Sequence, residues 1–398
     1  MSVASFDAVV VGGGPSGATA ATDLARAGRS VMLLDRGGRI KPCGGAIPPR
    51  LIRDFDIPDH LLVGRASWAR MIGPSDRAVD MKVDLKGDGG FVGMVDREVF
   101  DEWLRERAAL SGAERRTGTF ERIERDDLGR VIVVYTDTRG GPEQRVRARC
   151  VIGADGARSR VARASFSDAE RMPCVFAYHE VIRTPDAANA TFDRSRCDVF
   201  YQDEFSPDFY AWVFPHGDTA SVGVGSANKG YALRDSVGRL RAKLGLDDCE
   251  TIRREGAPIP LKPLRKWDNG RDVIVTGDAA GVVAPASGEG IYYAMVAGRH
   301  VAEATEDFFV TGRSQALAQA RKKFMRANGR TFWILGVMQY FWYRNDKRRE
   351  RFVAMCEDVD VQQLLWPAYM NKELVYAQPL AYARIFLKDV RHLLQTAN

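Results

Sequence analysis

Short apolar runs that end at glycine-rich turns divide the first part of the chain into expected strands and helices. Residues 8–11 form one such run before a Gly-x-Gly-x-x-Gly spacing and a helical pattern, and residues 31–34 form another that ends at Asp35. We predict that residues 6–37 make a strand, a helix and a second strand. Residues 120–123, 131–136 and 144–149, separated by turn-forming segments, predict a small antiparallel meander.

The middle of the chain changes character. Residues from about 172 to 259 predict a second, mostly antiparallel sheet with strands at 175–183, 199–202, 210–214 and 220–224, and residues 216–218 form a hairpin turn between the last two. Residues 273–309 predict a strand and a helix that rejoin the first domain, and the pattern is helical from residue 313. The fold class is therefore α/β. A Rossmann-like nucleotide-binding domain (1–170 and 263–312) carries an inserted antiparallel-sheet substrate domain (171–262) and a helical C-terminal region (313–398).

The first glycine segment reads Gly12-Gly13-Gly14-Pro15-Ser16-Gly17. In this spacing the first glycine permits a tight turn, the second lets the backbone approach a pyrophosphate, and the third lets the helix pack closely on the strand. The beginning of the helix offers free N–H groups and the positive end of its dipole. The acid at the end of the second strand stands where a ribose hydroxyl is bound. The predicted dinucleotide contacts are Gly12, Gly14, Pro15, Ser16, Gly17, Asp35 and Arg36.

Two later segments complete the pattern. Asp155 and Gly156 follow an apolar run as an Asp-Gly turn, and a strand over 272–276 ends at Gly277 and Asp278, whose carboxylate can accept a hydrogen bond from a ribityl hydroxyl. Residues 288–290 then begin another helix. In order and type these segments resemble the fingerprints of FAD enzymes related to the aromatic hydroxylases. The resemblance implies FAD, bound also by Asp155, Gly156, Gly277, Asp278, Gly288, Gly290 and Ile291.

Arg97 matches the arginine that such enzymes place near the FAD. The alternative is that Arg97 caps a surface helix.

Two further motifs narrow the resemblance. Residues 41–48 read KPCGGAIP and residues 207–215 read PDFYAWVFP. They resemble the CGG and PxxYxWxFP segments of geranylgeranyl reductases, closest to the branch that acts in chlorophyll and bacteriochlorophyll synthesis, and the similarity extends over most of the chain. Strand alternation by itself predicts that the aromatic face packs into a core, and both interpretations can hold. The resemblance implies that Cys43, Gly44 and Gly45 lie at the flavin and that the prenyl chain is bound by Tyr210, Trp212, Phe214 and Pro215.

The implied reaction saturates isolated double bonds of a geranylgeranyl chain to phytyl, as the pigment ester, the free diphosphate or both. An isolated alkene has no carbonyl to polarise, so a hydride must reach one carbon and a proton its neighbour, while the protein positions the alkene and excludes water. Cys43 and Tyr210 are the candidate proton donors. For Cys43, an inert packed thiol is the alternative.

The electron source is expected to bind transiently, because no second Gly-x-Gly-x-x-Gly follows a strand. The resemblance to the photosynthetic branch implies NADPH, and the sequence also allows a ferredoxin.

Composition agrees with a globular enzyme of two or three domains: 398 residues, 45% hydrophobic and 28% charged. Six cysteines show no CxxC and no metal-ligand spacing with the five histidines, which argues against a metal site and a disulfide framework. The formal charge of +6 is spread along the chain without a nucleic-acid module, so no nucleic-acid partner is predicted. With no signal peptide before Phe6, the expected location is cytoplasmic.

The tail carries an aromatic segment, residues 331–343, flanked by Arg330 and by the basic run 344–349. It is shorter than the roughly 20 residues of a membrane span. Rings at headgroup depth and arginines toward anionic lipid predict peripheral contact with the inner or photosynthetic membrane, and association with pigment-synthesis enzymes is a further expectation. The alternative is a buried helix whose rings close the prenyl pocket or cover the flavin domain.

Two other functions share parts of this pattern. An FAD monooxygenase of an aromatic or isoprenoid substrate would carry the same glycine segments, but the CGG and PxxYxWxFP segments argue against it. A prenyl carrier such as a Rab escort factor has a similar fold without chemistry, yet it has little reason to keep Asp35, Asp155 and Asp278 beside the glycines. We therefore expect a reductase.

Overall fold

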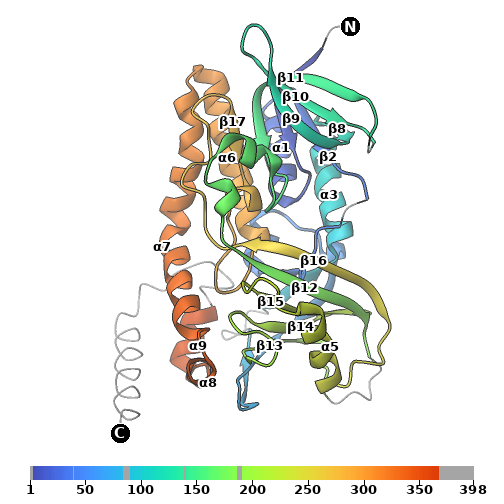
Figure 1. The fold of residues 1–398 in the computed structure, drawn as a ribbon, viewed down its shortest axis with the longest axis vertical. Coiled ribbons are helices and arrows are strands. Elements are labelled where there is room, and N and C mark those ends of the chain that lie inside the picture. The colour runs from blue at the N-terminus through green and yellow to red at the C-terminus, as the bar shows by residue number, and fades with distance from the viewer. Residues whose placement is uncertain (1–2, 39, 84–89, 139, 186–190, 367–398) are drawn as a thin grey trace. The chain divides into compact units, whose positions relative to one another are not determined.

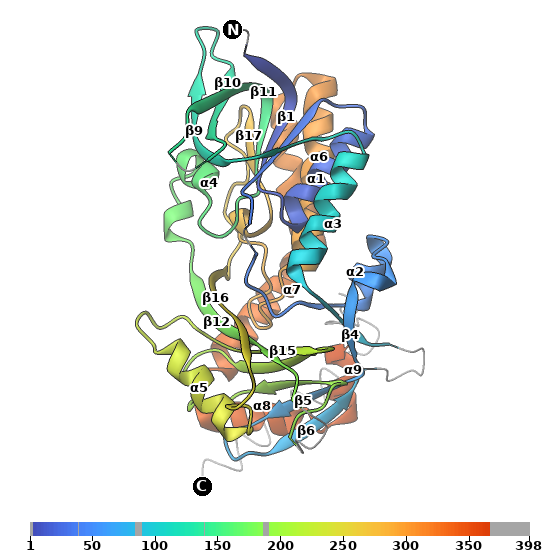
Figure 2. The same cartoon turned by 90° about the vertical axis from the view of Figure 1, so that its right-hand side faces the viewer.

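The structure, a computed structural model, describes residues 3–38, 40–83, 90–138, 140–185 and 191–366 (Figures 1 and 2). The chain divides into two compact units. The first unit comprises Met1–Cys43, Arg97–Ala177 and Gly256–Gln339, and the second comprises Gly44–Asp96, Tyr178–Glu255 and Tyr340–Asn398. We describe each unit by itself.

The first unit contains a mixed sheet. Its strands are β1 (Ala4–Val11), β2 (Val31–Asp35), β8 (Glu114–Thr117), β9 (Thr119–Arg125), β10 (Val131–Thr136), β11 (Glu143–Gly153) and β17 (Val273–Val275). Among the described residues the order is β8-β2-β1-β11-β10-β9, with β17 beside β11. Strands β8, β2, β1, β11 and β17 pair in parallel, whereas β10 pairs antiparallel with both β11 and β9. β2, β17 and the ends of β1 and β11 are continuous apolar buried runs, as is typical of the parallel part of a covered sheet, whereas β8 at the edge is polar and mostly exposed.

Helices of the first unit are α1 (Pro15–Arg26), α3 (Arg97–Leu110), α4 (Arg160–Ser165), α6 (Ile291–Thr311) and most of α7 (Ala318–Trp342), with short 3₁₀ turns at Ala169–Arg171, Gly277–Ala280 and Ser314–Leu317. α1 packs against both α6 and α3. Its buried face consists of alanines and other small residues, and a Cβ at Gly298 of α6 would overlap the Ser16 carbonyl. Small residues therefore bring the two helices into close contact beneath the first glycine segment.

The second unit contains an antiparallel-rich sheet of seven strands among the described residues, in the order β16-β12-β15-β14-β13-β5-β6. Their bounds are β5 (Trp68–Ile72), β6 (Ala78–Lys82), β12 (Cys174–Arg183), β13 (Arg196–Phe200), β14 (Ala211–His216), β15 (Thr219–Ser226) and β16 (Thr251–Pro260). β12 and β16 carry the chain from one unit to the other. Gly217, with φ of +69°, forms part of the two-residue turn between β14 and β15, which confirms the expected hairpin.

The remaining elements of the second unit are a small sheet of β3 (Ala46–Ile47), β4 (Leu62–Ala66) and β7 (Val92–Val95), and the helices α2 (Pro49–Asp54), α5 (Leu233–Lys243), α8 (Asp346–Met355) and α9 (Val359–Trp366), with a 3₁₀ turn at Asp59–Leu61. α5 packs on β15. Its Val237 and Leu240 join Ala211, Val213 and Val222 in one apolar core. No helix of the described residues is long and apolar enough to span a membrane.

The sequence-based division differs from the structure in two places. The predicted C-terminal region 313–398 is not a separate part, because residues up to Gln339 belong to the first unit and Tyr340 begins a segment of the second. Segment 44–96 belongs to the second unit, although the pattern placed it within the first domain. The reason is a long-range pairing, since β5 runs parallel to β13 with Trp68 opposite Arg196 and Ile72 opposite Phe200. Local periodicity carries no information about a partner so distant in sequence.

Candidate functional site

The first glycine segment has the geometry of a pyrophosphate cradle. Gly12 has φ of +106°, and a Cβ there would overlap the Ala154 carbonyl. A Cβ at Gly17 would overlap the Gly12 carbonyl, so the helix can approach the strand only without a side chain. At Gly14, by contrast, no described atom lies within 4 Å of an added Cβ. The glycine is therefore not required by packing there, and the open space in front of it fits a ligand.

The N-terminus of α1 is held by a proline in its first turn and by a side-chain hydrogen bond to the end of β17. Pro15 occupies the first turn of the helix, where its missing N–H costs no hydrogen bond. The hydroxyls of Ser16 and Thr276 lie 2.7 Å apart and are buried, which ties α1 to the end of β17. The free N–H groups of this helix end therefore lie beside the third glycine segment.

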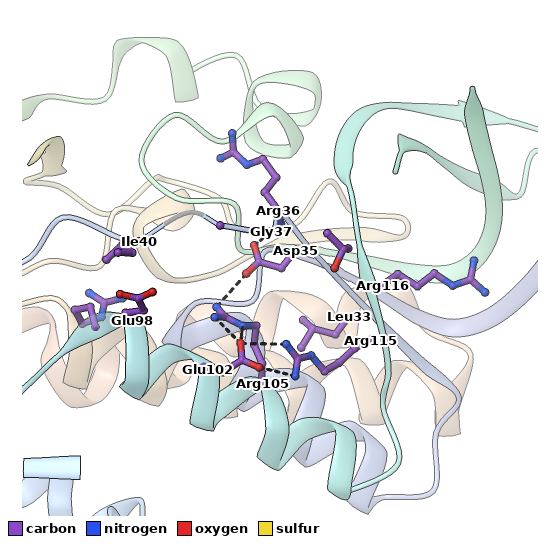
Figure 3. A pocket seen from close by; sticks show the side chains of 13 residues that line it. Leu33, Asp35, Arg36, Gly37, Ile40, Glu98, Glu102, Arg105, Arg115 and Arg116 are labelled. Carbon is purple, nitrogen blue, oxygen red and sulfur yellow. Dashed lines mark hydrogen bonds and ion pairs between the residues drawn. The ribbon is translucent and has the colours of Figure 1, made fainter. Parts of the chain in front are cut away.

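Asp35 lies beside a cavity of about 260 Å³ at the end of β2 (Figure 3). Its carboxylate accepts a hydrogen bond from Arg105 of α3 at 3.2 Å and one from the backbone N–H of Arg36 at 2.9 Å. Burial raises the pKa of Asp35, while the Arg105 charge favours the ionised form. Arg36, Arg115 and Arg116 also line the cavity. This polar, cationic hollow can hold a hydroxyl-bearing, anionic ligand.

Hydrogen bonds from the Asp155-Gly156 turn stabilise the N-terminus of α4. The Asp155 carboxylate accepts from the Ser159 hydroxyl and, at 2.7 Å, from the backbone N–H of Arg160, and the Ser159 side chain in turn caps the helix at the N–H of Ala162. Burial raises the pKa of Asp155, and the bond from Ser159 opposes that shift. Gly156 has φ of +88°, which a side chain would disfavour.

The third glycine segment surrounds Asp278. Gly277 and Gly288 both have positive φ, at +63° and +64°. Gly290 precedes the first residue of α6, Ile291, so the N-terminus of a second helix lies at this segment. Asp278 pairs with Lys41, a residue that the sequence analysis did not select.

Arg97 is the first residue of α3 and is only 7% exposed. It forms two hydrogen bonds to Asp101, of 2.8 and 2.7 Å, and also contacts the Cys43 sulfur. Burial opposes its charge, but Asp101 more than offsets this and raises the pKa of Arg97. Arg97 is therefore a buried permanent cation rather than the surface cap of the alternative interpretation.

The sequence analysis missed Arg105 as well as Lys41. A signal for Arg105 was present, because Arg97, Asp101 and Arg105 are spaced four residues apart and so share one helix face. Lys41 had no such signal, since its partner Asp278 is far away in the sequence.

In the second unit the aromatic motif has two different faces. Ala211 and Val213 of β14 point into the apolar core. Tyr210, Trp212 and Phe214 share the other face, with ring centroids 6.0 and 6.2 Å apart in succession. Tyr210 lies just before the strand rather than in it, and stacks on Phe209 at 4.3 Å.

The two sequence motifs meet on this face. A Cβ at Gly44 would lie 3.1 Å from the Phe214 ring and 3.6 Å from Trp212 Nε1, so the glycine backbone packs directly on both rings. A Cβ at Gly45, whose φ is +70°, would collide with His216. Pro215 is buried next to them in the chain. The second unit therefore brings Gly44, Gly45, Trp212, Phe214 and Pro215 together.

Comparison with known proteins gives a consistent result. A model of the FAD-binding domain family matches residues 5–181. The geranylgeranyl diphosphate reductase of Rhodobacter capsulatus is 56% identical over 388 residues, which is 98% of this chain and 97% of that protein. The enzyme of the same name from Synechocystis is 39% identical, over 97% of each chain.

Solved structures show the same fold. A geranylgeranyl bacteriochlorophyll reductase-like protein from Thermoplasma acidophilum superposes with a TM-score of 0.82 at 22% identity, covering 96% of this chain and all of that one. The p-nitrophenol 4-monooxygenase of Pseudomonas putida gives 0.71 at 18% identity, covering 92% and 98%. Enzymes of different chemistry share this fold, so these likenesses do not identify the reaction.

Sequence identity is the stronger evidence, because it is well above 30% over almost the full length of both chains. The expected cofactor, FAD, and the expected enzyme class are confirmed. The chain belongs to the geranylgeranyl diphosphate reductase family.

Proposed function

We propose that this protein reduces double bonds of a geranylgeranyl chain, carried by the diphosphate or by a pigment ester. The observation that carries the proposal is the contact of Gly44 with Trp212 and Phe214, because it joins the two motifs that set this chain apart from other flavoproteins. The first unit then serves as the FAD-binding part and the second as the substrate-binding part.

The residues of the first unit fit FAD. The N–H groups at the start of α1 and the open face of Gly14 would receive the pyrophosphate. Asp35 and the arginine-lined cavity would hold the adenosine end, and Asp278 with the start of α6 would hold the ribityl and flavin end. When bound and reduced, this cofactor supplies the hydride for the alkene.

The protein must supply the proton and the alkene's position. Cys43 is one candidate donor, because its sulfur lies at the buried guanidinium of Arg97. The phenol of Tyr210 is the other candidate. Trp212, which is 5% exposed, and Phe214 would form the apolar wall that orients the prenyl chain and excludes water.

A direct assay tests this proposal. We expect the purified holoprotein, given NADPH and either geranylgeranyl diphosphate or a geranylgeranyl pigment ester, to yield products heavier by whole pairs of hydrogen atoms, measured by mass spectrometry. A parallel reaction with reduced ferredoxin identifies the electron donor. An oxygen-containing product with oxygen uptake would instead identify a monooxygenase and refute the proposal.

We also propose that α7 contacts an anionic membrane surface. Trp333 and Tyr340 are 69% and 72% exposed, and Val337 between them is 48% exposed. Phe332 and Tyr343 are buried, so the aromatic segment is neither wholly internal nor wholly external. The outward stripe has helical spacing and is continued by exposed cations at both ends: Arg326, Arg330, Trp333, Val337, Tyr340 and Arg344. Rings between cations suit the headgroup region in which a prenylated pigment would be found.

Flotation with anionic liposomes tests the membrane contact. Salt should weaken binding without abolishing it, because charges are screened within about 10 Å at 0.1 M salt whereas ring insertion is not. Trp333→Ser combined with Tyr340→Ser should reduce flotation further. Trp342 is a poorer target than Trp333, because it is only partly exposed and packs near Phe352.

The control for that experiment is Trp68→Ser, which removes a tryptophan that is 39% exposed on β5. Equal flotation of the folded double variant and the control would show that the stripe on α7 is not the contact.

A further inference from the structure

A chain of buried polar side chains leads to the indole of Trp212 in the second unit. The indole Nε1 donates to the Ser221 hydroxyl at 3.1 Å, and that hydroxyl lies 3.0 Å from His179 Nδ1. His179 Nε2 lies 3.0 Å from a carboxylate oxygen of Glu255, within ion-pair range. His179 and Ser221 are each only 3% exposed. Side chains from three strands, β15, β12 and β16, thus follow one another in a row that begins at the indole nitrogen of Trp212 on β14.

The direction of the first hydrogen bond in this network is fixed by the indole. An indole N–H can only donate, so the Ser221 oxygen is an acceptor toward Trp212. Toward His179 Nδ1 the same hydroxyl can either donate its proton or accept a second hydrogen bond, because a hydroxyl has one proton and two lone pairs. His179 Nε2 lies near Glu255 but forms no hydrogen bond of good geometry within the described residues, so the hydrogen bonds of this network join Trp212, Ser221 and His179.

The ring is also confined by shape. A Cβ at Gly223 would overlap the Trp212 ring and would lie 2.6 Å from His179 Cβ. On another side, the Gly44 backbone packs against the indole, as described above. Absent side chains thus make room for one orientation of the indole, and the polar chain holds it there.

We propose that His179 and Ser221 are positioning residues that fix the indole of Trp212 and so set how the prenyl chain is held for reduction. The inference rests on the proposed function, in which Trp212 is a wall of the prenyl site. Burying polar side chains lowers the stability of a protein unless each polar atom forms a hydrogen bond. Apolar side chains in place of Ser221 and His179 could pack against β14 without that cost. What the polar chain adds is a single ring orientation, and a rigid wall is what successive double bonds of a flexible chain require.

The test removes the hydroxyl of Ser221, which links Trp212 to His179. Ser221→Ala should raise the KM for the prenyl substrate about fivefold, the equivalent of one typical hydrogen bond, with a smaller change in kcat. It should also increase the share of incompletely reduced product, read by mass spectrometry. Ser221→Thr, which keeps the hydroxyl, should restore both values. FAD content should stay normal in all variants.

The matched control is Ser236→Ala, which removes an equally buried hydroxyl, bonded to the Phe205 carbonyl at 2.6 Å in the same unit. If Ser221→Ala does not fold, Trp212→Phe breaks the same bond from the other end while keeping an aromatic wall. A product pattern in Ser221→Ala or Trp212→Phe that matches Ser236→Ala would overturn the inference.

Trp212→Ala separates this inference from the proposed function. Wild-type KM and product pattern in folded Trp212→Ala would show that the ring is no part of the prenyl site, and the proposed site itself would fail. A strong effect of Trp212→Ala beside a Ser221→Ala that behaves as the control would refute only the positioning role.

Discussion

Gly14→Ala is expected to weaken FAD binding by at least about 100-fold while leaving the apoprotein folded. The backbone at Gly14 has φ of −72° and ψ of −177°, which alanine adopts readily. No described atom lies within 4 Å of the added methyl, so the protein itself has no reason to exclude it. The methyl would project into the space where the backbone approaches the pyrophosphate.

Titration of apoprotein with FAD, followed by flavin fluorescence, measures the loss. Thermal unfolding of the apoprotein should change little, because only a helix N-cap is altered, at a cost of about 1 kcal/mol or less. Gly238→Ala is the control, since its Cβ also meets no described atom and it lies in α5 of the second unit. Wild-type FAD affinity in Gly14→Ala would place the pyrophosphate elsewhere.

The pattern of apolar and polar residues predicts those strands and helices that depend only on residues close together in the sequence. The strands predicted at 131–136 and 220–224 correspond to β10 and β15, and the helix after the first glycine segment is α1. The boundary between the meander and the second glycine segment does not exist in the structure, because β11 runs through both from Glu143 to Gly153. Its first part pairs antiparallel with β10 and its last part pairs parallel with β17, so one strand belongs to both patterns.

Contacts between distant segments could not be predicted in this way. The motifs at residues 43–45 and 207–215 were linked by resemblance, whereas the packing of Gly44 on Phe214 depends on where the small sheet of β3, β4 and β7 is held. His179 and Ser221 lack any motif, and their importance is visible only once β12, β14 and β15 lie side by side. A polar residue within an otherwise apolar strand, such as His179 or Ser221, indicates that a buried polar partner exists. The sequence does not show which residue that partner is.

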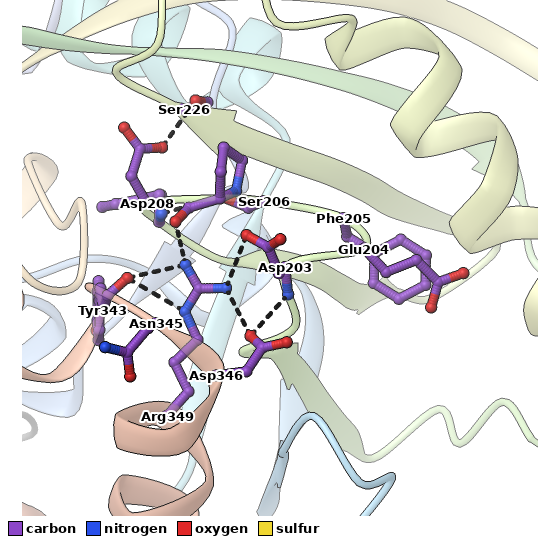
Figure 4. A network of polar contacts seen from close by, with 12 residues as sticks. Asp203, Glu204, Phe205, Ser206, Asp208, Ser226, Tyr343, Asn345, Asp346 and Arg349 are labelled. Carbon is purple, nitrogen blue, oxygen red and sulfur yellow. Dashed lines mark hydrogen bonds and ion pairs between the residues drawn. The ribbon is translucent and has the colours of Figure 1, made fainter.

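A buried arginine secures the start of the aromatic motif. Arg349 of α8 is fully buried. Figure 4 shows its guanidinium among Tyr343, Asp203 and Asp346. Its guanidinium donates to the carbonyl of Pro207, the first residue of the motif, and to the carbonyl of Tyr343 at 2.8 and 3.2 Å. Tyr343 directly follows the last residue of α7, so the cation also lies at the negative end of that helix. Burial lowers the pKa of Arg349, and Asp346 at 3.2 Å favours the charged form.

The carbonyls, rather than the carboxylates, make this arginine important. Asp346 is about half exposed and Asp203, 3.7 Å away, more so, and water can solvate both without the arginine. Exposed ion pairs of this kind contribute little. The carbonyl oxygens of Pro207 and Tyr343 would instead lose a donor inside the protein, at about 1–3 kcal/mol each.

Arg349→Met is therefore expected to lower the free energy of unfolding by about 3–5 kcal/mol, measured by urea denaturation. Arg349→Lys should be intermediate, because a single ammonium keeps the charge but cannot span both carbonyls as the planar fork does. The adjacent Lys347→Met changes an exposed side chain of the same helix and should stay within about 0.5 kcal/mol of wild type. If Arg349→Met were as stable as Lys347→Met, the two carbonyls would have other donors, and the start of the motif would be held by its aromatic contacts alone. In that case Tyr210, stacked on Phe209, would carry the attachment that we assign to Arg349.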